Sequence, residues 1–279
     1  MNTVQIFARF VACSLLAMSM TGCHQRGQET VTVSIDQVRA DIETLSQVRV
    51  YFAHQSVGRN ILRGIDALTA EAGVPLRIAE VNGAAMPEGP GLFHANVGEN
   101  GVADSKLAAF VTAVSAPAPG GYDLAVLKFC YTDIGEQARD QSAQELFQRY
   151  QDVMAGVRAK QPGLGIMHMT IPLRADPPGW KTTVKRWLGR PVPSDEGNLK
   201  RGEYNELLRA AVAPAELFDV ARLEATRADG STSSFSAGGR DVETLAPEHT
   251  YDGGHLNDPA TKYFAAAFLH SLAEAVRQR

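Results

Sequence analysis

The chain has 279 residues, of which 44% are hydrophobic and 21% are charged, a composition that predicts a folded core and excludes a disordered chain. The 27 basic and 31 acidic residues give a formal net charge of −4. This balance provides no broad cationic surface, so nucleic acid is not an expected partner.

The N-terminal segment predicts export. Arg9 is the sole charge among residues 1–22, and the apolar run of 11 residues from Phe10 to Met20 is typical of a signal peptide and too short to span a membrane. The following Thr21-Gly22-Cys23 resembles the lipobox of bacterial lipoproteins, in which cleavage before the cysteine precedes its acylation. We therefore expect lipidation of Cys23 and a cell-envelope location, on the periplasmic face or at the outer membrane. An ordinary secretory leader is the alternative.

The rest of the chain is expected to form one domain. Residues 23–33 are polar and predict a tether, and residues 34–279 predict a single folded unit. Cys130 is the sole cysteine of that unit, so an internal disulfide is not expected. The sequence does not indicate an oligomeric state.

Strand-like and helical patterns alternate along the chain. Ser34 and Gln37 form the pattern of a capping box before a first helix, and Asp258-Pro259 predicts the N-cap and first residue of the last helix. Five apolar runs predict strands, at residues 48–53, 76–81, 124–130, 164–169 and 217–220. Helices between such strands imply a three-layer α/β/α sandwich with a five-stranded parallel sheet, whose chemistry gathers at the carboxyl ends of the strands.

Two long insertions interrupt this pattern, near residues 171–198 and 224–251. The first contains both tryptophans, Trp180 and Trp187, and residues 174–201 carry seven bases against three acids. This segment could form a lid that stacks on sugar rings and attracts anionic glycans. The alternative is a solvated amphipathic helix whose tryptophans pack on the body of the protein.

Two short segments are candidates for catalysis. Ser56 directly follows the first predicted strand and opens a helix, a position that suits a nucleophile but is also common for an N-cap. Asp252 precedes His255 by three residues, so the carboxylate can orient the imidazole as a general base. Neither an HxxxH pattern nor a cysteine cluster accompanies them, so we expect no metal.

Together these segments resemble the SGNH hydrolases, the GDSL esterase superfamily. The family has a catalytic serine after the first strand and an Asp-x-x-His motif before the last helix, here Ser56, Asp252 and His255. Val81-Asn82-Gly83 resembles the glycine block that serves the oxyanion hole, residues 127–134 stand where a Gly-x-Asn-Asp block is usual, and residues 169–172 resemble the end of the fourth strand. The resemblance covers nearly the whole mature chain and implies a flavodoxin-like fold.

The sequence also departs from the family pattern. His54 and Gln55 stand where glycine and aspartate are usual, and Thr132 stands where the oxyanion-binding asparagine is expected. Loss of one oxyanion donor can cost about 3 kcal/mol of transition-state stabilisation. The resemblance therefore implies an oxyanion hole formed by the backbone of Ser56 and Gly83 with Thr132 as third donor, and His54 or Gln55 as alternatives to Thr132.

The resemblance implies an esterase that needs no cofactor and forms an acyl-enzyme on Ser56. The expected substrate is a small acyl ester or an acylated glycan. An O-acetyltransferase that passes the acyl group to a sugar, and a ligand-binding lipoprotein without catalysis, are the alternatives. Candidate substrate-contacting residues are His54, Gln55, Asn82, His94, Asp133, Trp180 and Trp187.

Overall fold

The computed structural model describes residues 34–81, 88–115, 121–135, 137–138, 140–176, 179–188, 190 and 192–279. The predicted leader, Cys23 and the tether lie outside the described residues, as do Asn82 and Gly83. In the described part of the chain, no helix combines the length and apolar character that crossing a bilayer requires.

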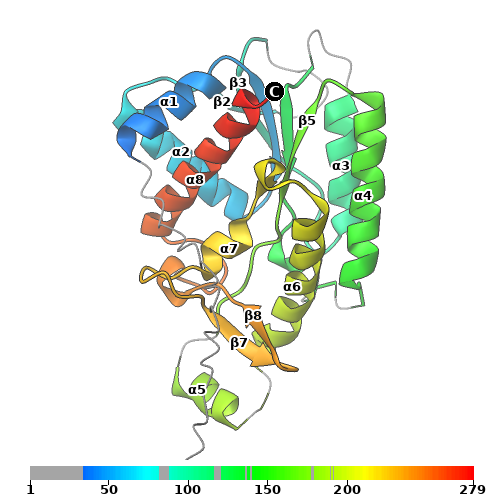
Figure 1. Ribbon diagram of the computed structural model, residues 1–279, viewed down its shortest axis with the longest axis vertical. Coiled ribbons are helices and arrows are strands. Elements are labelled where there is room, and N and C mark those ends of the chain that lie inside the picture. The colour runs from blue at the N-terminus through cyan, green and yellow to red at the C-terminus, as the bar shows by residue number, and fades with distance from the viewer. Residues whose placement is uncertain are drawn as a thin grey trace, which may run out of the picture.

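A parallel sheet lies between two layers of helices (Figure 1). Its six strands run in the order β2-β3-β1-β4-β5-β6. Their bounds are β1 Arg49–His54, β2 Ile78–Glu80, β3 Gly91–Asn96, β4 Leu124–Leu127, β5 Gly165–Met169 and β6 Leu217–Phe218. The predicted α/β sandwich with a parallel sheet is thus confirmed.

Each face of the sheet packs against its own helical layer because side chains alternate along every strand. Val50 and Phe52 of β1 join one core cluster, and Tyr51 and Ala53 join the other. The first layer consists of α1 (Ile35–Leu45), α2 (Val57–Ala72) and α8 (Asp258–Arg277). The second consists of α3 (Ala103–Ser115), α4 (Ala143–Lys160) and α6 (Pro193–Ala211).

The sheet contains one strand more than the five expected. Strand β3 comes from the glycine-rich stretch around His94, which is not among the five predicted strands. The strand has only six residues and lies in a stretch that contains Gly89, Gly91, Gly98 and Gly101. Its apolar pattern is therefore too short to predict a strand. The extra strand matters because β3, and not β2, lies beside β1.

The second insertion is more ordered than its polar composition suggests. The strand predicted over residues 217–220 ends at Phe218, and Asp219 caps α7 (Val220–Ala225) instead. Strands β7 (Ser234–Ala237) and β8 (Arg240–Glu243) then form an antiparallel hairpin. Its turn residues Gly238 and Gly239 have φ values of 58° and 77°, as a two-residue hairpin turn requires.

Short helical segments complete the described chain. They are η1 (Tyr131–Asp133), α5 (Trp180–Trp187), η2 (Pro214–Glu216) and η3 (Pro247–His249). The last helix starts one residue earlier than expected, at Asp258, because Asn257 and not Asp258 is its N-cap and accepts the hydrogen bond from Ala260 N–H. Helix α5 stands apart from the body of the molecule (Figure 1).

Candidate active site

Ser56 occupies a strained turn between β1 and α2. Its φ of 53° and ψ of −109° make it the one non-glycine residue with positive φ in the described part of the chain. The turn is closed by hydrogen bonds from Gly58 N–H to Gln55 O and from Arg59 N–H to Ser56 O. Such strain costs on the order of 1–3 kcal/mol and persists where surrounding contacts hold it.

Gly58 allows the first turn of α2 to approach the end of β1. A Cβ atom on Gly58 would lie 2.4 Å from the Cβ of His54, closer than two carbon atoms can approach. The glycine therefore permits the sharp change from strand to helix that exposes the Ser56 side chain at the edge of the sheet.

The structure brings Ser56, His255 and Asp252 together from segments 199 positions apart. Ser56 Oγ lies 2.6 Å from His255 Nε2, and His255 Nδ1 lies 2.6 Å from Asp252 Oδ2. The histidine side chain is 32% exposed and the aspartate 40%, so a substrate can reach the site from solvent.

Hydrogen bonds within the segment before α8 fix the Asp252–His255 pair. Asp252 Oδ1 accepts from the backbone N–H groups of Gly254 and His255, and Thr250 Oγ1 donates to His255 O. Burial raises the pKa of Asp252, but hydrogen bonds from the His255 backbone and ring and from Gly254 N–H outweigh it and lower this pKa to about 2. The ionised carboxylate favours the Nδ1–H tautomer, which leaves Nε2 to accept the Ser56 proton.

Aromatic side chains flank the imidazole on two sides. Tyr131 lies edge-on to His255 with 6.1 Å between ring centroids, and Tyr251 stacks on it at 6.4 Å. The Arg174 guanidinium lies 4.8 Å from the centroid of the Tyr131 ring. Tyr251 is 69% exposed, so it offers an aromatic surface beside the triad. The sequence reasoning missed Tyr131, Arg174 and Tyr251, because only the tertiary structure places them near His255.

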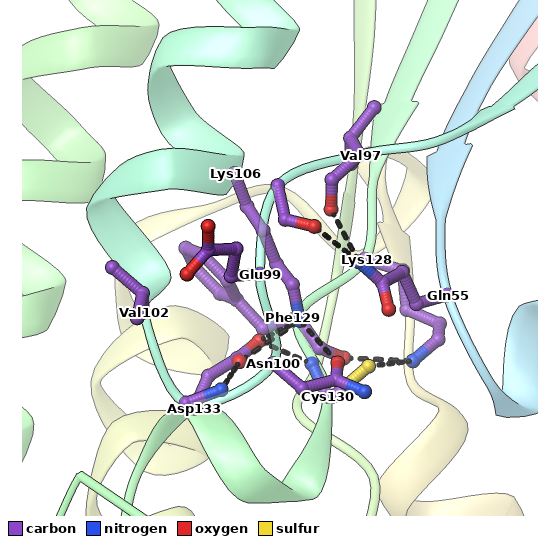
Figure 2. A network of polar contacts seen from close by, with 12 residues as sticks. Gln55, Val97, Glu99, Asn100, Val102, Lys106, Lys128, Phe129, Cys130 and Asp133 are labelled. Carbon is purple, nitrogen blue, oxygen red and sulfur yellow. Dashed lines mark hydrogen bonds and ion pairs between the residues drawn. The ribbon is translucent and has the colours of Figure 1, made fainter.

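The loop after β3 lies beside the Ser56 turn. Gln55 Nε2 donates to Val97 O at 2.9 Å, as Figure 2 shows, and it also donates to Gly98 O. Gly98 has a φ of 60°, and a Cβ atom there would lie 2.6 Å from Lys106 N. Gln55 therefore joins two loops at the sheet edge, and its amide is already engaged by backbone oxygens.

The topology provides a second candidate for the oxyanion glycine, since Gly83 lies outside the described residues. Strand β2, which precedes Gly83, is separated from β1 by β3, so their axes lie about 10 Å apart. Gly98 instead follows the strand adjacent to β1. The sequence feature that could have indicated Gly98 is a glycine directly after an apolar run, the same feature that the segment of Gly83 shows.

Asp133 is a structural residue and not an open contact for substrate. Its side chain is fully buried and forms an ion pair of 2.6 Å with Lys106, also fully buried. It also accepts hydrogen bonds from Gly101 N–H and Cys130 N–H, so it links α3, the loop after β3 and the end of β4 (Figure 2). Its proposed contact with substrate is thus incompatible with its position.

His54 and His94 pair inside the protein. His54 is 1% exposed, and its Nε2 lies 3.1 Å from Nδ1 of His94, which belongs to β3 and not to a loop. Burial, and then the nearby His94 and Lys128, lower the pKa of His54 to about 3, so the ring is neutral. A direct contact between His54 and substrate is excluded by this burial.

Thr132, the candidate third oxyanion donor, lies near the end of the strand next to β1. Thr132 belongs to η1 at the carboxyl end of β4, and its hydroxyl is buried with no hydrogen-bond partner among the described residues.

Trp180 and Trp187 are 72% and 84% exposed on α5, which stands away from the sheet edge (Figure 1). Both side chains are mostly exposed, so they do not pack on the body of the protein. Among the described residues, no group of three or more His, Cys, Asp or Glu is placed to bind a metal.

Comparison with known proteins supports the architecture. No family model matches the chain, and no curated protein is similar enough to count as a match. A crystal structure of a Bacteroides fragilis protein, assigned provisionally as an acylhydrolase, is 14% identical, covers 89% of this chain and 97% of its own, and gives a TM-score of 0.50. A GDSL-like lipase from Bacteroides thetaiotaomicron is 13% identical, covers 88% and 98%, and gives 0.48. The chain therefore shares the fold of the Bacteroides fragilis protein, in agreement with the predicted α/β architecture.

Proposed function

We propose that this protein is a serine esterase that forms an acyl-enzyme on Ser56. The observation that carries the proposal is the continuous contact from Ser56 Oγ to His255 Nε2 and from His255 Nδ1 to Asp252 Oδ2, each 2.6 Å. A hydroxyl, an imidazole and a carboxylate in this order are the arrangement that activates serine for acyl transfer.

The reaction would follow from these contacts. His255 removes the proton from Ser56 as Oγ attacks the ester carbonyl, and the ionised Asp252 stabilises the imidazolium. His255 then returns the proton to the departing alcohol, and water activated by the same imidazole releases the acid. The backbone N–H of Ser56 and the Thr132 hydroxyl are the proposed oxyanion donors, and the position of β3 favours Gly98 over Gly83 as the third.

Hydrolysis of short p-nitrophenyl esters by the chain lacking residues 1–22 tests this proposal. We expect Ser56→Ala and His255→Gln each to lower kcat by at least about 10⁴-fold, because triad members act as a unit. A fluorophosphonate probe should label the wild-type chain and not Ser56→Ala. Ser46→Ala, a change at the half-buried C-cap of α1, is the matched control. Retained activity in Ser56→Ala would refute the nucleophile, and failure of the probe on the wild type would favour a ligand-binding protein.

The proposed substrate class is an acylated sugar, including O-acetylated polysaccharide. Tyr251 supports it, because an exposed aromatic ring beside the base can stack on a sugar ring. Tyr251→Ala should raise KM for an acetylated oligosaccharide while leaving KM for p-nitrophenyl acetate unchanged. An equal change in KM for both esters would refute the contact between Tyr251 and the sugar, but it would not contradict the proposed esterase activity.

Export and lipidation at Cys23 are also part of the proposal, and their support is the sequence of residues 1–23. Incorporation of an alkynyl fatty acid in bacterial cells should label the wild-type chain and not Cys23→Ser. Equal labelling of both would place the acyl group elsewhere, and labelling of neither would favour an ordinary secretory leader.

A further inference from the structure

Helix α5 presents an apolar face to solvent. Trp180, Val184, Trp187 and Leu188 are 72%, 39%, 84% and 52% exposed. At about 100° per residue, these four positions fall within an arc of about 100° on one side of the helix. Leu188 N–H donates to Val184 O, so Leu188 continues the last helical turn. Among the described residues, the other large hydrophobic side chains with comparable exposure are only Val102 and Tyr251.

Positive charge accompanies this apolar face. The sequence from Gly179 to Arg190 contains four bases and no acid, whereas the whole chain has a net charge of −4. Lys181 and Lys185 are exposed and, at about 100° per residue, follow the apolar arc along one border. The helix therefore combines a local cationic character with a continuous apolar stripe.

This combination matches a bilayer surface better than a sugar polymer or the protein core. Tryptophan is suited to the boundary between headgroups and acyl chains, and lysine to anionic headgroups. A sugar would use the two rings but would leave Val184 and Leu188 uncovered. The body of the protein does not cover the face, because both tryptophans remain more than two-thirds exposed.

The position of the helix leaves this face accessible. Figure 1 shows α5 projecting beyond the β7–β8 hairpin, away from the layered body of the molecule. The helix can therefore lie along a flat surface without a change in the core.

We propose that α5 binds the surface of an anionic lipid bilayer. It lies in the interfacial plane, with Trp180, Val184, Trp187 and Leu188 toward the acyl chains and Lys181 and Lys185 at the headgroup phosphates. This membrane contact is additional to the proposed acyl anchor on Cys23 and goes beyond the proposed esterase activity. It does not depend on that activity, so Ser56→Ala should bind as the wild type does.

Intrinsic tryptophan fluorescence provides a direct test, because the chain has two tryptophans and both belong to α5. The experiment uses the chain from residue 23 onward with Cys23→Ser, so that no acyl anchor forms. Vesicles of equal parts phosphatidylglycerol and phosphatidylcholine should shift the emission to shorter wavelength and sediment with the protein. Brominated acyl chains in the same vesicles should quench the emission. Pure phosphatidylcholine should bind at least about tenfold more weakly.

Variants separate the apolar and the charged contributions. Trp180→Ala with Trp187→Ala should abolish sedimentation with the vesicles, and Lys181→Glu with Lys185→Glu should weaken it about tenfold or more. Arg63→Glu with Lys160→Glu makes the same charge change at exposed positions of α2 and α4, and should leave most of the binding intact.

Three results would overturn the proposal. The first is an unchanged emission spectrum and no sedimentation with anionic vesicles. The second is an emission shift in solution, without lipid, that follows self-association of the chain, which would assign the face to a second copy. The third is a shift with soluble acetylated polysaccharide but not with vesicles, which would assign it to a glycan.

Discussion

At the scale of single residues, the strained backbone of Ser56 is expected to lower the stability of the protein while it positions the hydroxyl for catalysis. A residue with a Cβ is strained at a φ of 53°, whereas glycine adopts this conformation freely. Ser56→Gly and Ser56→Ala both remove the hydroxyl, but only the first relieves the strain. Although glycine makes the unfolded chain more flexible, we expect Ser56→Gly to be more stable than Ser56→Ala by about 1 kcal/mol.

Urea unfolding of the two variants measures this difference, and neither should hydrolyse esters. If Ser56→Ala is as stable as Ser56→Gly, the turn does not store strain.

Thr132 offers a second test at this scale. Its buried hydroxyl has no hydrogen-bond partner among the described residues, although a buried polar group normally has one. If it donates to the developing oxyanion, Thr132→Val should lower kcat about 10²–10³-fold with little change in KM. Thr132→Ser keeps the hydroxyl and should retain most of kcat. Equal kcat values for Thr132→Val and the wild type would exclude Thr132 from the oxyanion hole.

At the scale of elements, the buried Lys106–Asp133 pair joins α3 to the end of β4 near the site. Removal of one charge leaves the other buried without its counterion, which typically costs about 3–5 kcal/mol. We expect Asp133→Asn to lower the free energy of unfolding by this amount. Addition of Lys106→Met should recover at least half of the loss, because an apolar side chain then fills the space.

Urea unfolding followed by far-ultraviolet circular dichroism measures both changes. A double variant no more stable than Asp133→Asn would show that the hydrogen bonds to Gly101 and Cys130, and not the ion pair, hold these elements together.

Prediction of elements from sequence succeeded where the signal is local. The Ser34 side chain accepts from Gln37 N–H as a cap should, although the Gln37 side chain contacts Asp41 instead of completing the capping box. Strand β3 was missed because its assignment depends on pairing with β1 and β2, and not on its own short pattern. Helix α7 replaced part of a predicted strand because Asp219 caps it.

At the scale of the whole molecule, Glu224 links protonation to global stability. It is fully buried on α7 and accepts a hydrogen bond from Leu173 N–H, and its other oxygen has no partner in the described part of the chain. Burial, only partly offset by Leu173 N–H, Lys128 and Arg201, raises its pKa from 4.5 to about 8. The folded protein therefore holds a proton here that the unfolded chain releases near pH 4.5.

The stabilising contribution of this proton is complete below about pH 4.5 and is lost as the pH rises to about 8, by about 1.4 kcal/mol per pH unit. Glu224→Gln cannot ionise, so its stability relative to the wild type should rise through this window and level off above about pH 8. Urea unfolding at a series of pH values measures the difference, with the exposed Glu206→Gln as control. A pH-independent difference would show that Glu224 is ionised in the folded state.

The sequence by itself determined the layered α/β architecture and the three residues of the candidate triad. Apolar periodicity and caps act between near neighbours, and the order of Ser56, Asp252 and His255 resembles a known family pattern. Only the tertiary structure decided that the loop after β3, which contains Gly98, lies beside the Ser56 turn, because β3 and not β2 pairs with β1. It also decided that Asp133 and His54 are buried and that the tryptophans are not, since burial depends on contacts between segments distant in the chain.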